Sequence, residues 1–401
     1  MKRVAVLAFF LGLVALWGYS LGEENPYISS EVCKACHGAI YDQWSHSLHA
    51  RSHEDPVFSA AHLQSIEHAG SSATSSCLSC HAPTTRVTKD YELRMNITRE
   101  GVTCNFCHTV SGLEVDKPIK YLLSPGETIY GKAVNKTAPH RLEYREFFLK
   151  SEFCGGCHDL YVNNAPVMET YTEWKAGPYA ATKQCQDCHM DVIEGSRSHR
   201  FTGGHFESRV KEAAGVRLET EIKDGNARVT AYVTNKGSGH KIPTGIPSRR
   251  LILHLKAKDD RGTIIYQEDR YYRKVLTDKE GREITEDFRF MLDSAKVLSD
   301  NRIAPMETRV ETFTFPVPST TGQVYTEASL EYSYKPIILM PTEISVIMAE
   351  NSTIRVGLPV GTPEGQGGIS GYTKVLWGIL VLLLVLVVVI EALRWRKGKR
   401  D

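Results

Sequence analysis

The ten cysteines of this 401-residue chain form five pairs, and a histidine follows each pair directly. Two residues separate the cysteines in every copy, and the copies are Cys33–His37, Cys77–His81, Cys104–His108, Cys154–His158 and Cys185–His189. Thiols at this spacing lie about one helical turn apart and can form thioethers with the two vinyl groups of one haem. The adjacent histidine can then bind the iron. The pattern predicts five covalently attached haem c groups.

The predicted attachment residues are the cysteines Cys33, Cys36, Cys77, Cys80, Cys104, Cys107, Cys154, Cys157, Cys185 and Cys188. The predicted iron ligands within the motifs are the histidines His37, His81, His108, His158 and His189. A redox dithiol needs no histidine after it and would not recur five times. Zinc ribbons combine such pairs two by two, and five is an odd number. No cysteine is left over for a disulfide, although an exported protein would favour one.

A second axial ligand for each iron has to come from the ten remaining histidines, eight of which precede Val210. Two histidines on one iron favour electron transfer over ligand binding. His199 and His205 follow the fifth motif, and the glycines before His205 allow close backbone approach to a porphyrin. One of His62 and His68 is expected to be a further ligand. His46 and His53 are expected to be exposed or to neighbour a ligand.

The sequence resembles the multihaem cytochrome family that includes the tetrahaem cytochrome c-554 of ammonia oxidation. The resemblance lies in the first motif followed by Tyr41, Trp44, Ser47 and His49-Ala50, and in Phe153–Asp159 preceded by Pro139-His140-Arg141. It covers residues 29–205, and it implies that His49 and His140 are distal iron ligands. This chain has five motifs rather than four, and it continues beyond the resembling part.

Successive motifs begin 44, 27, 50 and 31 residues apart, which is too uneven for a solenoid repeat. Residues 25–210 are therefore expected to form one mostly helical domain packed around haem. So few residues around five macrocycles cannot hold them far apart. Stacked or edge-to-edge haems are expected.

After residue 210 the apolar residues alternate, as in Ala227, Val229, Ala231 and Val233. Alternation with turn signals between the segments predicts an antiparallel β-sandwich over residues 214–356, with a barrel as the second possibility. The loop 237–245 places His240 between glycines. Sandwich domains fused to multihaem cytochromes often carry a similar Gly-His-x-x-Pro-Thr-Gly pattern, which implies that His240 is a distal ligand. His254 is expected on the outer face.

Both ends of the chain carry apolar segments. Residues 1–22 combine a basic start, an apolar run and small residues, as in a secretory signal peptide, with an uncleaved anchor as the alternative. Residues 357–371 read as a linker and 372–393 as a transmembrane helix, with a buried core helix as the alternative. The basic residues 394–401 indicate a cytoplasmic C-terminus, with the haem and sandwich domains on the other side of the membrane.

The formal net charge of +1 gives no indication of nucleic-acid binding. These features together predict a membrane-anchored cytochrome that transfers electrons between redox protein partners. They identify no catalytic residue. One alternative is an oxidoreductase acting on a small nitrogen or sulfur compound at a haem with an open distal side. Another is a subunit of an extracellular cytochrome filament. The sequence leaves the oligomeric state open.

Overall fold

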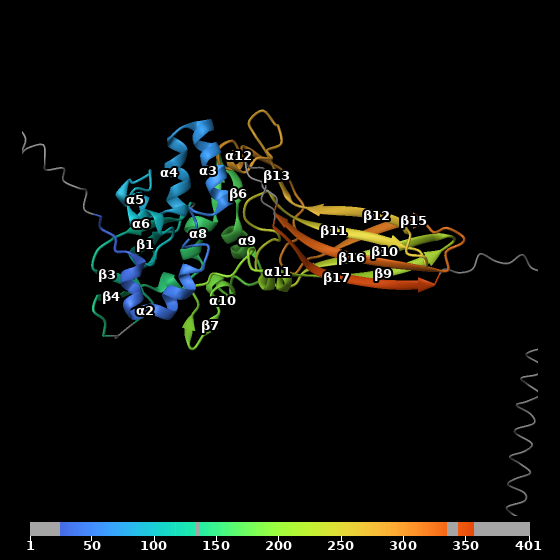
Figure 1. Ribbon diagram of the computed structural model, residues 1–401, viewed down its shortest axis with the longest axis horizontal. Helices are drawn as coiled ribbons and strands as arrows, with labels where there is room; N and C mark the ends of the chain where they lie inside the picture. Colours follow the sequence, from blue (N-terminus) through green and yellow to red (C-terminus); the bar gives the residue numbers. More distant parts are fainter. Residues whose placement is uncertain (1–24, 117, 134–136, 335–343, 357–401) are drawn as a thin grey trace, which may run out of the picture.

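The computed structural model describes residues 25–116, 118–133, 137–334 and 344–356. Short helices and ribbons of residues 25–213 gather in one part, which we call the haem-motif region. The long strands of the remaining residues form a second part beside it (Figure 1). All five cysteine motifs lie in the first part.

The haem-motif region is not mostly helical, and that prediction is wrong. Its helices are short, namely α2 (Ser30–Ser45), α3 (Pro56–Ala69), α4 (Ser72–His81), α5 (Thr85–Thr88), α6 (Asn96–Arg99), α7 (Cys104–His108), η1 (Glu146–Leu149), α8 (Glu152–His158), α9 (Thr170–Ala176), α10 (Cys185–His189) and α11 (Glu207–Ala213). Between them lie four two-stranded ribbons, made by β1 (Val110–Glu114) with β2 (Lys120–Leu123), β3 (Thr128–Gly131) with β4 (Arg141–Tyr144), β5 (Leu160–Val162) with β6 (Ala165–Met168), and β7 (Val192–Ile193) with β8 (Ser196–Arg197).

A physical reason favours short ribbons over long helices between the motifs. The segments between motifs must return the chain to the next attachment point within a few tens of residues. Three of the four ribbons are antiparallel and do this with a short connection, whereas helices need longer stretches to pack on one another; β3 and β4 pair in parallel. The hydrophobic cluster that lies within this region is small, and its buried residues are Ile119, Tyr171 and Trp174. Helix-on-helix packing therefore does not fill the interior of this region.

Each motif lies on a helix, and local capping stabilises the helices of the third and fifth motifs. Thr103 precedes α7, and its hydroxyl accepts the backbone N–H of Phe106 at 2.9 Å. Gln184 and Asp187 form a reciprocal capping box at the start of α10. Cysteines three apart on such a turn face the same side, so both thiols point into the same space.

The second part consists of two antiparallel sheets that face each other. One contains β9 (Ala214–Lys223), β10 (Asn226–Asn235) and β15 (Thr308–Pro316), and the other contains β11 (Arg249–Lys258), β12 (Ile264–Tyr272), β16 (Gln323–Tyr334) and β17 (Ile344–Val356). Alternate residues point inward, and Val229, Leu253 and Leu330 are fully buried. Their burial forms one continuous core between the sheets.

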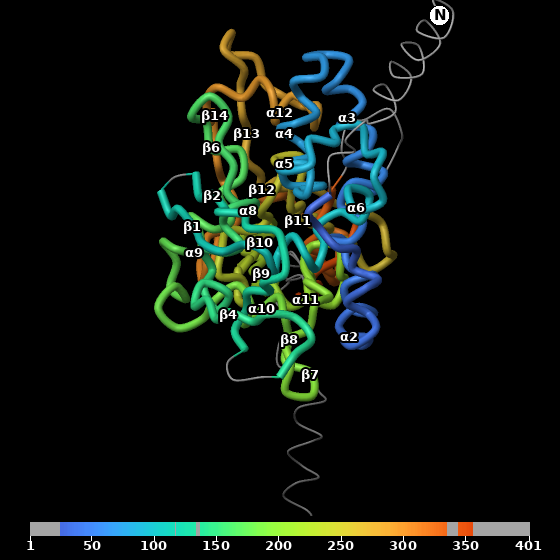
Figure 2. Tube along the Cα trace, turned by 90° about the vertical axis from the view of Figure 1, so that its left-hand side faces the viewer, coloured from blue at the N-terminus to red at the C-terminus, as the bar shows by residue number. Residues whose placement is uncertain are grey.

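A segment between β12 and β15 extends from the second part to the haem-motif region. It comprises β13 (Lys274–Thr277), α12 (Asp287–Leu292) and β14 (Lys296–Asp300). Leu276 and Phe290 share a hydrophobic cluster with Val167 of β6. Helix α3 lies against α12 in both views (Figures 1 and 2). The two parts therefore meet through packed side chains.

The predicted single-pass membrane topology needs correction. Among the residues that the structure describes, no helix has both the length and the apolar character needed to cross a bilayer. The longest, α2, has 16 residues and carries Glu31, Lys34 and Asp42. A span needs about 20 apolar residues. The described residues therefore give no support to the predicted single-pass membrane localisation. The segments 1–22, 357–371, 372–393 and 394–401 lie outside the described residues.

Candidate functional site

One large cavity runs through the haem-motif region and along the edge of the second part. Its volume is about 2030 Å³, whereas pockets for single small ligands measure about 300–1,000 Å³. All ten motif cysteines and all five motif histidines line it, and none of these cysteines forms a disulfide. The five predicted distal ligands, His49, His140, His199, His205 and His240, line it too. The fold thus gathers residues from positions 33 to 240 around one space.

Three motif histidines share one backbone contact. The Nδ1 atom lies 2.7 Å from Ser52 O in His81, 2.8 Å from Tyr130 O in His108, and 2.5 Å from Thr202 O in His189. Metal-bound histidines typically donate their second ring N–H in this way, which leaves the other nitrogen free for the metal. The contact is informative only with burial, because the exposed His46 also makes it, to Asp42 O at 2.7 Å.

Two pairs of imidazole rings face each other across the cavity. The ring centroids of His49 and His158 lie 6.2 Å apart. Those of His189 and His240 lie 6.3 Å apart, with the rings inclined by only 11°. Two imidazole nitrogens that bind one metal ion at about 2.0–2.1 Å place their ring centroids on the order of 6 Å apart. Each pair therefore has the separation that one iron requires.

The backbone around His49 is held from the loop before the third motif. Its carbonyl accepts the N–H of Val102 at 2.8 Å, and Trp44 Nε1 donates to Val102 O at 2.8 Å. Gly101 has a φ of +66°, and a Cβ there would lie 2.5 Å from His49 O. Only glycine fits this position without displacing the backbone of the predicted ligand. This explains how a residue beside α2 comes to lie opposite His158.

The other predicted ligands come from different elements. His140 precedes β4, and its buried Nδ1 has no hydrogen-bond partner. His199 follows β8, and its backbone N–H donates to Gln43 Oε1 of α2 at 3.0 Å. His205 lies before α11, with Nε2 3.4 Å from Arg249 Nη2. Thus a single space receives side chains from both ends of the haem-motif region.

Burial favours the neutral form of five histidines that line the cavity. It lowers the pKa of His49 to about 3, with help from the nearby charges of His158 and His199. Burial is also the main reason that the pKa values of His158, His199, His205 and His240 fall to about 4. The neutral ring is the form that binds a metal ion. The cavity therefore presents imidazoles in the form that can bind iron at neutral pH.

Cysteines of different motifs are neighbours. Three pairs of thiols lie close enough to shift each other's pKa, namely Cys33 with Cys104, Cys80 with Cys157, and Cys154 with Cys185. They bring together the first and third, the second and fourth, and the fourth and fifth motifs. Tyr121 packs edge-on against Phe106 of the third motif at 5.8 Å, and its hydroxyl lies 3.7 Å from Cys157 Sγ. All five motifs are thus connected through neighbours.

Comparison with known proteins points in the same direction. Residues 32–109 match the family model "Cytochrome c554 and c-prime". The penta-haem cytochrome c552 from Thermochromatium tepidum is 25% identical, with a TM-score of 0.67 over 82% of this chain and 100% of that chain. The chain belongs to the multihaem c-type cytochromes. Its cofactor is haem c, and its activity is electron transfer or related redox chemistry.

Other comparisons add little. The structural-genomics target SoR45 is 10% identical to the cytochrome, with a TM-score of 0.19 over 39% of this chain and 97% of that chain. The C-terminal domain of wzt gives 10% identity and a TM-score of 0.20 over 39% and 83% of the two chains. Among curated proteins, none matches this chain.

The residues of this cytochrome fit haem c in their chemistry. Free thiols in pairs, neutral imidazoles and two ring pairs at metal-binding separation all face one cavity. Arg249 lines the cavity, and its buried Nε has no hydrogen-bond partner among the described residues. An unpaired buried guanidinium donor suits the carboxylates that a haem carries. Sequence reasoning did not identify this arginine, because nothing in the local pattern distinguishes it.

The structure separates the two histidines between which the sequence did not decide. His62 lines the cavity, and its buried Nε2 has no hydrogen-bond partner. His68 instead faces α12, where it lies 3.5 Å from Asp293 Oδ1 and edge-on to Phe288. His68 therefore belongs to the contact between the two parts. Both residues lie on α3, and only the packing of that helix distinguishes them.

Gly156, between the cysteines of the fourth motif, allows a specific stability test. A Cβ there would lie 2.5 Å from Tyr121 Cζ. The Tyr121 hydroxyl donates to Phe153 O at 2.6 Å, so the ring cannot simply swing away. We expect Gly156→Ala to lower the free energy of unfolding by about 1–3 kcal/mol, the usual cost of overpacking. Chemical denaturation followed by circular dichroism measures this.

Gly38 provides the matched control, since it follows the first motif and a Cβ there meets no atom within 4 Å. Because Gly38 lies inside α2 and alanine favours helix, Gly38→Ala is expected to leave the free energy of unfolding unchanged or to raise it by up to about 1 kcal/mol. Equal losses in the two variants would show that Tyr121 does not restrict this position.

Proposed function

We propose that this cytochrome is an electron carrier that holds five haem c groups and passes electrons between redox partner proteins. The observation that carries the proposal is the single cavity lined by ten motif cysteines and ten predicted histidine ligands. Haem held between two imidazoles would supply one-electron redox chemistry. The penta-haem relative covers 82% of this chain, which supports the count of five.

The protein residues have distinct roles in this proposal. The paired cysteines would fix each group covalently, and the motif histidines would bind its iron. His49 would hold the same iron as His158, and His240 the same iron as His189. Backbone carbonyls at the Nδ1 atoms fix the tautomer and the ring orientation. Two imidazoles leave no open position on an iron, which favours electron transfer over chemistry on a small molecule.

The neighbouring motifs suggest a route for the electrons. The fourth motif has neighbours in the second, the third and the fifth, and the first adjoins the third. Cys36 of the first motif is the only exposed cysteine of the ten. We therefore propose that a partner exchanges electrons at the first motif. The fourth motif would then pass electrons between the second, the third and the fifth.

Intact mass and a spectrum of the reduced protein with carbon monoxide test this function together. We expect a mass that exceeds that of the processed chain by five haem masses, and a spectrum that carbon monoxide does not change. A mass that fits bound zinc or disulfides would contradict the haem assignment. A spectrum that carbon monoxide changes would reveal an open iron and favour the oxidoreductase alternative.

A further inference from the structure

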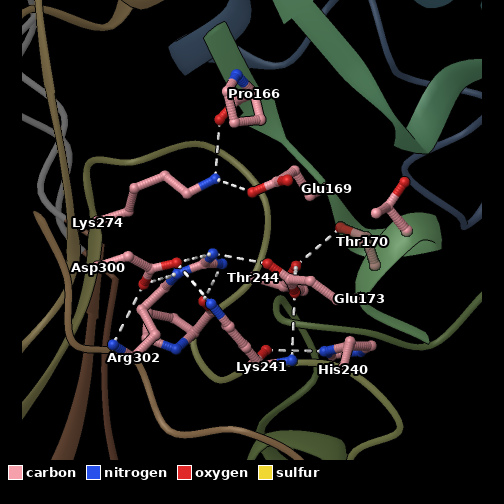
Figure 3. A network of polar contacts seen from close by, with 12 residues as sticks. Pro166, Glu169, Thr170, Glu173, His240, Lys241, Thr244, Lys274, Asp300 and Arg302 are labelled. Carbon is pink, nitrogen blue, oxygen red and sulfur yellow. Dashed lines mark hydrogen bonds and ion pairs between the residues drawn. The ribbon is translucent and has the colours of Figure 1, made fainter. Parts of the chain in front are cut away.

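A buried network of charges lies where the haem-motif region meets the second part (Figure 3). It contains three carboxylates and three cations, and its members are Glu169, Glu173, Asp300, Lys241, Lys274 and Arg302. The side chains of Arg302 and Glu173 are only 4% and 7% exposed. Such a pair is costly to desolvate, so its presence calls for a role beyond stability.

Glu173 of α9 links this network to the loop that carries His240. Its Oε1 accepts from Arg302 Nη2 at 2.6 Å. Its Oε2 accepts from the backbone N–H of Lys241 at 3.2 Å and from the Thr244 hydroxyl at 3.4 Å. One carboxylate thus contacts the loop at Lys241, directly after His240, and again at Thr244. In Figure 3 the side chain of Glu173 lies between Arg302 and this loop.

Arg302 holds the same loop from the other side. Its Nη1 donates to Pro243 O at 3.2 Å, and its Nε donates to Asp300 Oδ1 at 2.8 Å. Asp300 in turn accepts from Lys241 Nζ at 2.8 Å. Arg302 is thus linked to the loop directly at Pro243 and, through Asp300, at Lys241.

The second part anchors the His240 loop on both sides of the imidazole. Asn235 Nδ2 donates to His240 O at 3.0 Å, and Ile242 exchanges backbone hydrogen bonds with Ile303 at 3.0 and 3.1 Å. Among the described residues, the hydrogen-bond partner of the imidazole is the carbonyl oxygen of the next residue, 2.9 Å from Nδ1. Since Glu173 belongs to the haem-motif region, its contacts tie this loop to α9 across the junction.

We propose that Glu173, together with Arg302, is a positioning residue that holds His240 at iron-binding distance from His189. This inference rests on the proposed function, in which His240 is a distal ligand. The pair acts as an ionic clamp across the junction, and it determines which residue of the second part reaches the cavity. A buried charged pair can specify one arrangement even where it adds little stability.

The test compares two carboxylates of the same segment in the holoprotein. Glu173→Gln removes the charge that holds the loop. Glu169→Gln is the matched control, because Glu169 also pairs with a buried cation, Lys274, at 2.7 Å but does not contact the loop. Electron paramagnetic resonance measures the fraction of high-spin iron in each variant.

We expect Glu173→Gln to raise the high-spin fraction towards one iron in five, to shift the potential of that haem, and to admit carbon monoxide. Glu169→Gln should keep every iron low-spin. The double variant Glu173→Gln/His240→Ala should show no more high-spin iron than His240→Ala alone. If Glu173→Gln stays fully low-spin, or if both single variants respond equally, the proposal that Glu173 positions His240 is wrong.

Two further variants keep the outcomes distinct. If Glu173→Gln yields no folded holoprotein, Thr244→Val removes only the loop hydroxyl that contacts Glu173 and Thr170. It should still raise carbon monoxide binding, and no rise would overturn the clamp. If His240→Ala leaves every iron low-spin, His240 is not a ligand, and that part of the proposed function is wrong. If His240→Ala gives high-spin iron and Glu173→Gln does not, only the clamp fails.

Discussion

Replacing His240 by alanine is expected to leave all haems attached and to convert one iron from low spin to high spin. The haems stay because the cysteine thioethers do not involve His240. The iron changes because the ring of His240 faces that of His189 at 6.3 Å, and alanine leaves that side without a ligand. Carbon monoxide should then bind one iron. Added imidazole should restore the low-spin signal by occupying the space that alanine leaves.

Two other histidines provide the controls for this experiment. His49→Ala is the positive control, since its ring faces His158 at 6.2 Å. His46→Ala is the negative control, because His46 makes the same Nδ1 contact to a carbonyl but its side chain is 67% exposed. A His240→Ala protein whose irons all remain low-spin would make His240 a loop residue without a role in ligation.

Arg302→Leu is expected to lower the free energy of unfolding by about 3–5 kcal/mol, the usual cost of breaking a buried ion pair. The guanidinium pairs with Glu173 at 2.6 Å and with Asp300 at 2.8 Å. Leucine would leave both carboxylates in the junction without their main partner. Denaturation of the holoprotein followed by circular dichroism measures the loss.

Arg273→Leu repeats the same substitution at the surface, where Arg273 pairs with Glu283 at 2.9 Å. Exposed pairs contribute about 0–1 kcal/mol, so this control should lose little. Comparable losses in the two variants would indicate that the junction is open to water.

The loss caused by Arg302→Leu should also depend on pH. Burial opposes the charge of Asp300, but Arg302 and Lys241 outweigh it and hold the pKa of Asp300 well below its usual value. A carboxylate with a lowered folded-state pKa contributes stability above its unfolded pKa, about 3.9, and loses that contribution as pH falls. The difference between variant and parent should therefore be largest near neutral pH and shrink below about pH 4. A difference that grows in acid would contradict this assignment.

The haem chemistry could be read from the sequence because it is local. Two cysteines and a histidine within five residues already form an attachment site, so Cys33–His37 needs no partner elsewhere to be recognised. The strands from Ala214 onward could also be anticipated, since alternation follows directly from the pleat of a strand with one buried face.

The remainder depended on tertiary structure. The sequence overestimated helix in the haem-motif region, because the chain returns to each motif through short ribbons and a large cavity takes the place of a helical core. His62 and His68 lie six residues apart on α3, yet one lines the cavity and the other meets α12. The opposition of His240 to His189 and the contact between Glu173 and Arg302 join positions 51 and 129 residues apart. Sequence patterns register neighbours along the chain, whereas these contacts exist only because two separately patterned parts pack together.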